Sequence, residues 1–274
     1  MEKPFYFGAV GDVHGEMHRM VALLSGVEKK RGIQLEFVLQ VGDFEPHRDE
    51  QDLQTMAAPS KYRDLGDFHH YHQGWRSFPW PIYFIGGNHE PYGYLDQFPE
   101  GDWLTENCRY LGRSGWLELD GGFTMAGLSA IYNSDWFSQP RPDVSLFGTI
   151  SNKSFIYFNE SDLQLLLDLE RNIDVLLLHE WPANIIDPND QAEFEQARRS
   201  MRYDCVGNEM SEIVMHWLSP KLVLCGHMHK KYRRQLQSSK NQALTICCLA
   251  NVHQGPDSVA IFEVNQDGEI TELQ

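Results

Sequence analysis

The chain has 274 residues, of which 42% are hydrophobic and 23% are charged. This composition is that of a globular protein and excludes a disordered or collagen-like chain. The 39 acidic residues outnumber the 23 Lys and Arg residues, which gives a formal net charge of −16. Such a charge disfavours broad, non-specific binding to nucleic acid or to an anionic membrane surface, but it does not exclude a phosphate held at a local cationic site.

The cysteines indicate a reducing compartment. They are odd in number and show no Cys-x-x-Cys spacing, so we expect buried free thiols: Cys108, Cys205, Cys225, Cys247 and Cys248. The last two are neighbours in a strand-like run and are expected to face opposite ways. The first apolar run, residues 5–10, is too short for a signal peptide, and no run approaches the ~20 residues of a membrane helix. We expect a cytoplasmic chain with no membrane partner, and the sequence indicates no oligomeric state.

Short apolar runs recur along the chain, and five of them stop abruptly at a polar cluster that contains Gly, Asp, Asn or His. Runs of this kind, rich in Val, Ile, Leu and Phe, are typical of buried strands. The five runs are residues 5–10, 37–41, 81–85, 174–178 and 221–225. Three further strands are expected at residues 123–131, 245–252 and 258–264.

Helix-compatible segments lie between these strands, at residues 17–31, 49–72, 161–171 and 192–218. Ser161 is expected to cap the third of them. The alternation predicts an α/β fold with a parallel or mixed sheet, in which ligands bind at the carboxyl ends of the strands. Because the polar clusters run from residue 12 to residue 229 and are expected to meet in one place, we predict a single domain over residues 1–274.

The five polar clusters together predict a metal centre. Taken singly, each Gly-Asp has an ordinary explanation as a turn, and each histidine as a surface residue. Together they supply two carboxylates, one amide and five imidazoles, which suit Mn, Fe or Zn. This is more than one ion uses, and a carboxylate can bridge two ions about 3.5–4 Å apart. We therefore predict two divalent ions in a phosphohydrolase, with these candidate residues: Asp12, His14, Asp43, Asn88, His89, His179, His227 and His229.

The order of these motifs resembles the calcineurin-like metallophosphoesterase family. The motifs are Gly-Asp-Val-His-Gly (11–15), Gly-Asp (42–43), Gly-Asn-His-Glu (87–90), a later His179 and Gly-His-Met-His (226–229). The resemblance implies a four-layer αββα sandwich of two mixed β-sheets flanked by helices. It also implies ligand sets for two ions: Asp12, His14 and His229 for one, Asn88, His179 and His227 for the other, with Asp43 as the bridge. His89 would stay off the metals and act on the phosphate or as general acid to the leaving oxygen.

A narrower resemblance is to the lariat RNA debranching enzymes of this family. It rests on residues 42–44, 52–63, 84–90, 110–112, 127–132 and 179–182. It implies a phosphodiesterase that acts on RNA or a nucleotide by in-line attack of a metal-bridging hydroxide. Two departures leave true lariat cleavage open: Asp12 stands where debranching enzymes commonly have Cys, and their long C-terminal extension is missing. The complete ligand set favours stable occupancy by two ions.

Substrate contacts are less clear from the sequence. The continuation Phe44-Glu45-Pro46 replaces the Asp-Arg-Gly of serine/threonine phosphatases, whose arginine clamps a terminal phosphate, so a diester is favoured. Arg63, Arg141 and Arg202 are candidate substitutes or ordinary surface charges.

The aperiodic segment 133–153, with Trp136 and Arg141, is predicted to be a substrate loop, because loops of this length tend to be functional and the matching region of debranching enzymes helps to recognise branched RNA. The alternative is a loop that packs on its own domain. The basic residues between 230 and 234 either face solvent or contact substrate, and the same choice applies to the histidines at 69, 70 and 72.

Two other functions remain open at this point. The chain could be a metal-dependent phosphomonoesterase that acts on nucleotides or phosphoproteins, or a non-catalytic interaction protein that retains the fold. Preference for a monoester over a diester would favour the first. A chain with neither bound metal nor Mn-stimulated turnover would favour the second.

Overall fold

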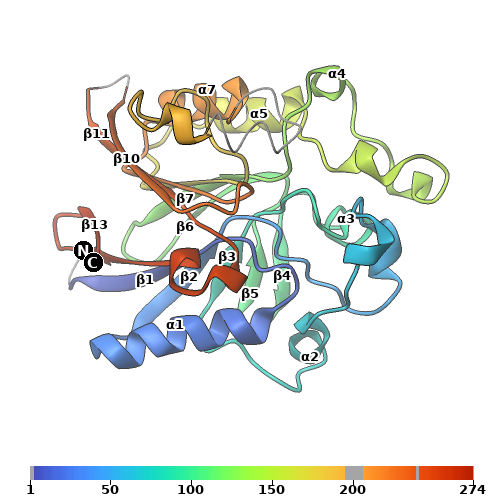
Figure 1. Cartoon of the computed structure of the whole chain (residues 1–274), viewed down its shortest axis with the longest axis horizontal. Coiled ribbons are helices and arrows are strands. Elements are labelled where there is room, and N and C mark those ends of the chain that lie inside the picture. The colour runs from blue at the N-terminus through green and yellow to red at the C-terminus, as the bar shows by residue number, and fades with distance from the viewer. Residues whose placement is uncertain (1–2, 195–205, 239–240, 274) are drawn as a thin grey trace.

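The structure is a computed structural model, which describes residues 3–194, 206–238 and 241–273. Two β-sheets lie face to face, and helices cover their outer sides, with α1 (Met17–Arg31) outside one sheet and α5 (Glu160–Leu167) and α7 (Glu209–Leu218) outside the other (Figure 1). This arrangement confirms the predicted αββα sandwich of two mixed sheets.

The first sheet combines N-terminal and C-terminal strands in the order β13-β12-β1-β2-β3-β5-β4. Strands β1, β2, β3 and β5 are parallel, whereas β4, β12 and β13 run antiparallel to their neighbours. The strands are β1 (Phe5–Val10), β2 (Leu35–Gln40), β3 (Ile82–Phe84), β4 (Asp102–Thr105), β5 (Cys108–Tyr110), β12 (Val259–Val264) and β13 (Ile270–Glu272).

The second sheet has the order β10-β11-β9-β8-β7-β6. Its four inner strands are parallel, and its edge strands β6 and β10 are antiparallel to their neighbours. The strands are β6 (Ser114–Glu118), β7 (Thr124–Leu128), β8 (Val175–Leu178), β9 (Leu222–Cys225), β10 (Tyr232–Gln237) and β11 (Ala243–Cys248).

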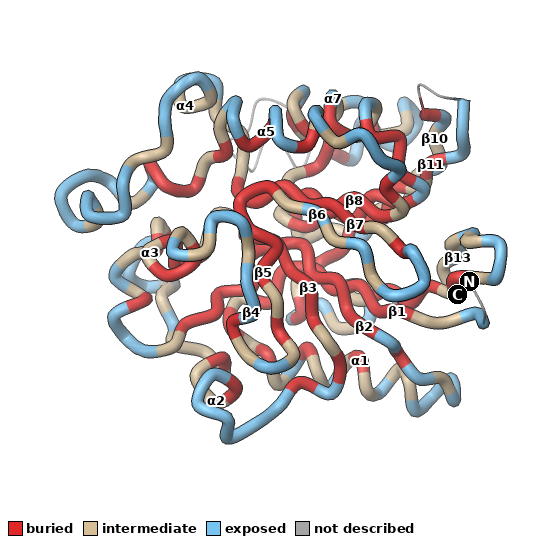
Figure 2. Tube along the Cα trace, turned by 180° about the vertical axis from the view of Figure 1, so that it is seen from behind, coloured by how far each residue is buried: buried red, intermediate tan, exposed pale blue. Residues whose placement is uncertain are grey.

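Alternate residues of the inner strands fill two cores. In β8, Leu177 lies between the sheets together with Leu39 of β2, whereas Leu176 joins the outer core with Leu166 and Met215 of the covering helices. Successive side chains of a strand point to opposite faces, so a continuous apolar run buries both. Figure 2 shows the inner strands buried along most of their length.

The described cysteines are buried, as the sequence predicts. Cys247 lies in the core between the sheets and Cys248 in the outer core, as predicted, and the four described cysteines are buried and free. Cys205 lies outside the described residues.

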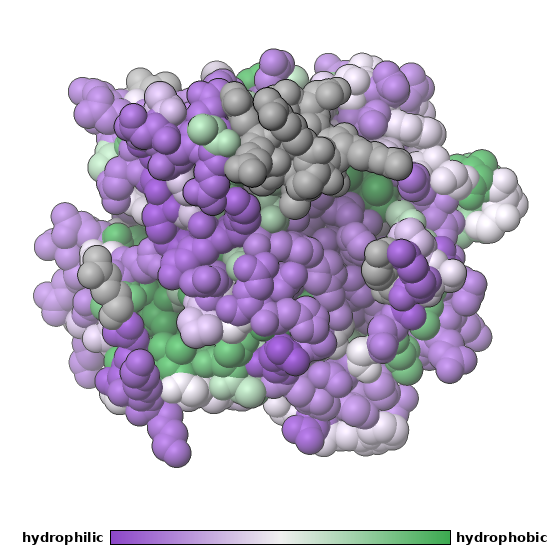
Figure 3. All heavy atoms as spheres, viewed as in Figure 1, coloured by the Kyte–Doolittle hydropathy of each residue, from purple (hydrophilic) through white to green (hydrophobic). Residues whose placement is uncertain are grey.

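The face in Figure 3 is largely hydrophilic, with one apolar hollow near its lower left. Among the described residues no helix is long and apolar enough to cross a bilayer.

One predicted helix is largely wrong and another starts earlier than predicted. Residues 49–72 form only two 3-10 turns, η1 (Asp52–Thr55) and η2 (Ser60–Tyr62), and the short α2 (Phe68–His72). Pro59 and the positive φ of Gly66 interrupt the helix. The cap of α5 is Asn159 in a capping box with Asp162, not Ser161. For residues 192–218, α7 confirms the second half, and residues 195–205 lie outside the described part.

Arg113, directly before β6 of the second sheet, is buried and joins separate parts of the chain. Its guanidinium forms two hydrogen bonds with Asp96, at 2.6 and 2.7 Å, and a third of 2.8 Å with the carbonyl of Phe155. It also lies 3.5 Å above the ring of Tyr92 in α3 (Tyr92–Leu95). It therefore connects α3 to Phe155, just after the long 133–153 segment.

We expect Arg113→Leu to lower the free energy of unfolding by about 3–5 kcal/mol, because it leaves the Asp96 carboxylate buried without its cation. Urea unfolding of the variant measures the loss. Arg171→Leu is the matched control, because Arg171 forms an exposed pair with Glu118 at 3.3 Å and should change little. Equal effects in the two variants would contradict a buried-pair role for Arg113.

Candidate metal centre

The eight predicted side chains all follow the carboxyl ends of strands, and the structure brings these ends together. Strands β1, β2 and β3 are parallel in one sheet, and β8 and β9 are parallel in the other. The residues follow them in order: Asp12 and His14 after β1, Asp43 after β2, Asn88 and His89 after β3, His179 after β8, and His227 and His229 after β9.

One group of ligands gathers around His229. Its Nε2 lies 3.0 Å from Asp12 Oδ2 and 3.1 Å from His14 Nε2. Ligand atoms of Asp12, His14, Asp43 and His229 all lie within 4.8 Å of one another. This spacing fits one cation with mixed nitrogen and oxygen donors.

A second group gathers around His179. Its Nε2 lies 3.1 Å from Asn88 Oδ1 and 3.5 Å from Asp43 Oδ1. The ring centroid of His227 is 5.0 Å from that of His179. Asp43 therefore lies between the two groups, the position that a bridging carboxylate requires.

The backbone of the site is unusual. His14, Asp43, Glu45, His227 and His229 all have positive φ, between 49° and 64°. Residues other than glycine rarely adopt this conformation, and such strain clusters at functional sites. Packing must therefore force these turns, and they aim several polar side chains at one point.

Gly42 shows how closely the turns approach one another. Its φ is +96°, and a Cβ added there would lie 2.4 Å from Nδ1 of His179. That nitrogen is hydrogen-bonded to the carbonyl of Val41 at 2.8 Å, which fixes the ring. Any side chain at residue 42 would have to displace His179.

We therefore expect Gly42→Ala to reduce the bound metal and to lower turnover on a phosphodiester by about 10–100-fold, the usual loss when a ligand's support is removed. Metal analysis together with steady-state kinetics tests this. Gly26→Ala in α1 is the control, since a Cβ there meets nothing within 4 Å. Unchanged metal content in Gly42→Ala would contradict the close approach.

The two carboxylates of the site are buried, with Asp12 0% and Asp43 2% exposed. Burial alone would raise the pKa of Asp43, but the charges of His179 and His89 hold it well below its usual range. Burial likewise opposes charge on His179, yet Asp43 raises the pKa of this imidazole to about 10. The buried carboxylates thus depend on neighbouring positive charge.

The surroundings shift the pKa values of His14 and His227 in opposite directions. Burial disfavours charge on His14, but its 2.8 Å hydrogen bond to Glu45 and the charge of Asp43 raise its pKa to about 9. Burial and then the charge of His179 lower the pKa of His227 to about 4, so this ring is neutral and able to act as a ligand.

The donors fit divalent cations. Two buried carboxylates with imidazoles and one amide oxygen form a nitrogen and oxygen set suited to Mn, Fe or Zn. A bound cation replaces the protons that otherwise balance buried carboxylates, so metal binding and protonation compete at these residues.

His89 lies next to these groups, and one ligand atom each of His14, Glu45 and His89 also lie within 4.8 Å of one another. Its backbone N–H donates to Asp43 Oδ1 at 2.8 Å, while its side chain is 30% exposed, with Nδ1 3.8 Å from Glu45 Oε1. A partly exposed imidazole next to Asp43 is able to exchange a proton with a bound molecule.

Three residues outside the predicted ligand set support the site. Glu90 accepts from the backbone N–H groups of Phe44, Gly87 and Glu45, at 2.8, 3.1 and 2.9 Å, and so joins the turns after β2 and β3. Burial and then Asp43 raise its pKa to about 8. Glu45 orients His14, and Asn251 Nδ2 lies 2.9 Å from Nδ1 of His229. Glu90 belongs to the Gly-Asn-His-Glu motif, which could have indicated it.

The residues predicted to contact substrate are held by their own chain. Arg63 donates to the carbonyls of Ala58 and Met56, at 2.8 and 3.2 Å. Arg141 pairs with Asp162 of the α5 capping box. Trp136, in α4 (Ser134–Phe137), lies nearly parallel to Tyr157 at 6.2 Å. Contact of these three residues with substrate stays a prediction, and Arg202 lies outside the described residues.

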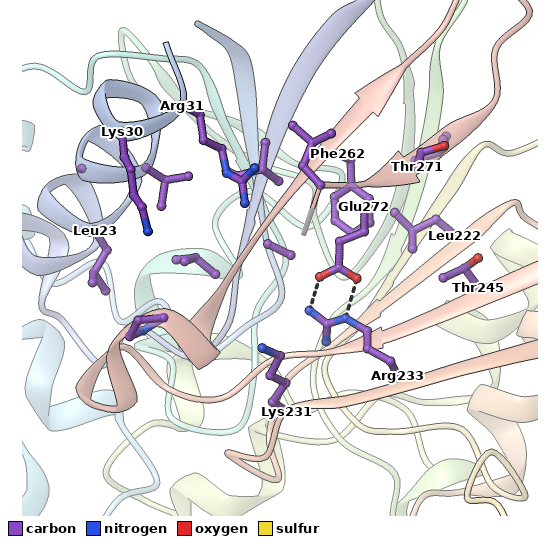
Figure 4. A pocket seen from close by; sticks show the side chains of 18 of the residues that line it. Leu23, Lys30, Arg31, Leu222, Lys231, Arg233, Thr245, Phe262, Thr271 and Glu272 are labelled. Carbon is purple, nitrogen blue, oxygen red and sulfur yellow. Dashed lines mark hydrogen bonds and ion pairs between the residues drawn. The ribbon is translucent and has the colours of Figure 1, made fainter. Parts of the chain in front are cut away.

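Three of the four basic residues after the last motif line a separate groove: Lys231, Arg233 and Arg234. Lys231 and Arg233 line a cavity of about 1000 Å³ between α1 and the edge strands β10 and β13 (Figure 4). There Arg233 pairs with Glu272 at 2.6 Å, and Lys231 lies 3.2 Å from Asp257. Both side chains are thus paired with carboxylates in this groove.

Comparisons with known proteins agree with this geometry. The chain is similar to the lariat debranching enzyme of Drosophila melanogaster, at 29% identity over 85% of this chain and 44% of that protein. It is similar to the one from Entamoeba histolytica, at 30% identity over 84% of this chain and 65% of that protein. The chain spans about half the length of the curated relatives it matches.

The fold and the family are also supported. One crystal structure aligns with 99% of both chains at a TM-score of 0.57 and 13% identity, a likeness that shows the fold alone. A family model described as calcineurin-like phosphoesterase matches residues 5–231, most of the chain and all of the strand-end motifs. The chain belongs to the calcineurin-like phosphoesterase family.

Proposed function

We propose that this chain is a two-metal phosphodiesterase that acts on RNA or on a nucleotide diester. The observation that carries the proposal is the position of Asp43, which lies within 4.8 Å of the Asp12 group and 3.5 Å from His179 of the other group. Two bound cations would supply Lewis-acid activation of water and neutralise charge on the phosphoryl oxygens.

The chain's own residues have the following roles in this proposal. Asp12, His14 and His229 would hold one ion, Asn88, His179 and His227 would hold the other, and Asp43 would be shared between the two groups. Glu45, Glu90 and Asn251 keep these side chains in place through the hydrogen bonds described above. His89 donates a proton to the departing oxygen, which avoids release of a strongly basic alkoxide.

A diester is the better substrate class because Phe44 and Glu45, rather than an arginine, directly follow Asp43. Phe44 is fully buried, and Glu45 is bonded to His14. Terminal phosphate dianions are usually bound by a bidentate arginine. Arg63 and Arg141, the described candidates for this role, are already bonded within the chain.

The proposal extends to the setting of the reaction. Ligands come from strands of both sheets, which supports one catalytic domain over residues 1–274. The four described free, buried cysteines support a cytoplasmic location. The names of the relatives favour an RNA substrate with a 2′-5′ branch over other diesters.

A substrate panel at fixed Mn²⁺ tests the proposal. It compares 2′-5′-branched RNA, linear 3′-5′ RNA, a cyclic nucleotide, bis-p-nitrophenyl phosphate and p-nitrophenyl phosphate. We expect turnover of the diesters to exceed that of the monoester, with branched RNA the best substrate. Much faster hydrolysis of p-nitrophenyl phosphate than of its diester would instead identify a phosphomonoesterase.

A further inference from the structure

A second group of metal-ligating side chains lies outside the centre described above, where the start of α1 meets α2. His18 is in the first turn of α1, Asp67 directly precedes α2, and His70 is within α2. One ligand atom from each of the three lies within 4.8 Å of the others. The proposed phosphodiesterase mechanism uses none of these residues.

The spacing in this group matches that of the main centre. His18 Nδ1 lies 3.1 Å from Asp67 Oδ1, the same distance that separates the Nε2 atoms of His14 and His229. The rings of His18 and His70 have centroids 5.3 Å apart, compared with 5.1 Å for His14 and His229. Two imidazoles bound to one tetrahedral zinc at about 2.0–2.1 Å would have centroids about 5.2 Å apart.

The group also contains a buried nitrogen atom that lacks a partner. Nδ1 of His70 is shielded from solvent and forms no hydrogen bond within the described part of the chain. Shielded polar atoms of this kind need an explanation, and a cation facing His70 provides one. Desolvation and then the imidazoles of His69 and His18 lower the pKa of His70, which keeps the ring neutral and able to bind a metal.

Asp67 is held in position independently of any ligand. Its Oδ2 accepts from the backbone N–H of His18 at 3.0 Å, one of the N–H groups at the start of α1 that lack a helical partner. Its own backbone N–H donates to the carbonyl of Gly15 at 2.8 Å. The carboxylate is thus fixed beside His18, and the backbone of Asp67 is fixed to Gly15, the residue after His14.

We propose that His18, Asp67 and His70 form a third cation site, which binds one zinc ion through two imidazole nitrogens and one carboxylate oxygen. A water molecule completes the tetrahedron. Two nitrogen donors with a single carboxylate favour zinc over magnesium or calcium, which prefer all-oxygen sites. The ion links the start of α1 to α2.

Metal counting on the intact chain tests this site. The wild type, His70→Ala and the control His72→Ala are saturated with Zn²⁺, dialysed and analysed by plasma mass spectrometry. His72 is an exposed residue of the same short helix. We expect His70→Ala to bind one ion fewer per chain than the wild type, and His72→Ala to match the wild type.

Two further measurements address misfolding and the main centre. His18→Gln should lose the same ion, and zinc should raise the Tm of both variants less than that of the wild type, because a ligand stabilises the state that binds it. Turnover of bis-p-nitrophenyl phosphate with Mn²⁺ should be unchanged, since neither residue contacts the main centre. Equal zinc content in the wild type and in correctly folded His70→Ala, or an equal loss in His72→Ala, would overturn the proposal.

Discussion

Replacing Asp43 by Asn is expected to abolish turnover, with a loss on the order of 10³-fold or more, and to reduce the bound metal. Asp43 lies within 4.8 Å of ligand atoms of the first group and 3.5 Å from His179 of the second. The amide keeps the shape but loses the charge, so it can neither bridge two cations nor balance the imidazoles around it. Metal analysis and kinetics on bis-p-nitrophenyl phosphate measure both effects.

A matched control separates this effect from general charge loss. Asp49→Asn removes an exposed carboxylate six residues further along the chain, which accepts a hydrogen bond from the backbone N–H of Gln51. Metal content and turnover of Asp49→Asn should equal those of the wild type. If Asp43→Asn kept two ions and full activity, the bridging role would be wrong.

Replacing His89 by Ala is expected to leave the metal content unchanged and to slow the reaction on RNA by about 10²–10⁴-fold, the range for loss of a general acid. The side chain is partly exposed beside Asp43, and only its backbone N–H bonds to that carboxylate. The ligand set should therefore survive the substitution.

The choice of leaving group distinguishes proton donation from a structural role. p-Nitrophenolate is a weak base and departs without a proton, whereas a ribose oxygen needs one. The loss in His89→Ala should therefore be much smaller on bis-p-nitrophenyl phosphate than on RNA. Equal losses on both substrates would argue against proton donation, and an emptied metal centre would make His89 a ligand.

Much of the fold could be predicted from the sequence because the central strands are buried on both faces. A continuous run such as residues 174–178 then shows its strand character without help from its neighbours. Edge strands such as β4, β6 and β13 were missed because they are short and half-exposed, so their patterns are weak. Residues 49–72 were predicted to be helical, although Pro59 and Gly66 prevent a continuous helix.

The candidate site, like the fold, could be predicted only in part from the sequence. The ligands could be predicted because carboxylates and imidazoles at strand ends are few and occur in a specific order. Their supports could not be, because Asn251 reaches His229 from another loop, through a turn that has no motif of its own. Nor does any local pattern show that His18 lies beside His70, since 52 positions separate them and only the packing of α1 against α2 brings them together.

In the proposed function, two cations held by the strand-end ligands make this chain a phosphodiesterase. The most direct test is turnover of bis-p-nitrophenyl phosphate by the chelator-stripped chain as Mn²⁺ is returned. We expect no turnover in the stripped chain and a rise that reaches its plateau at two catalytic ions per chain. Full activity without metal, or no activity after complete reconstitution of a folded chain, would contradict a two-metal phosphodiesterase.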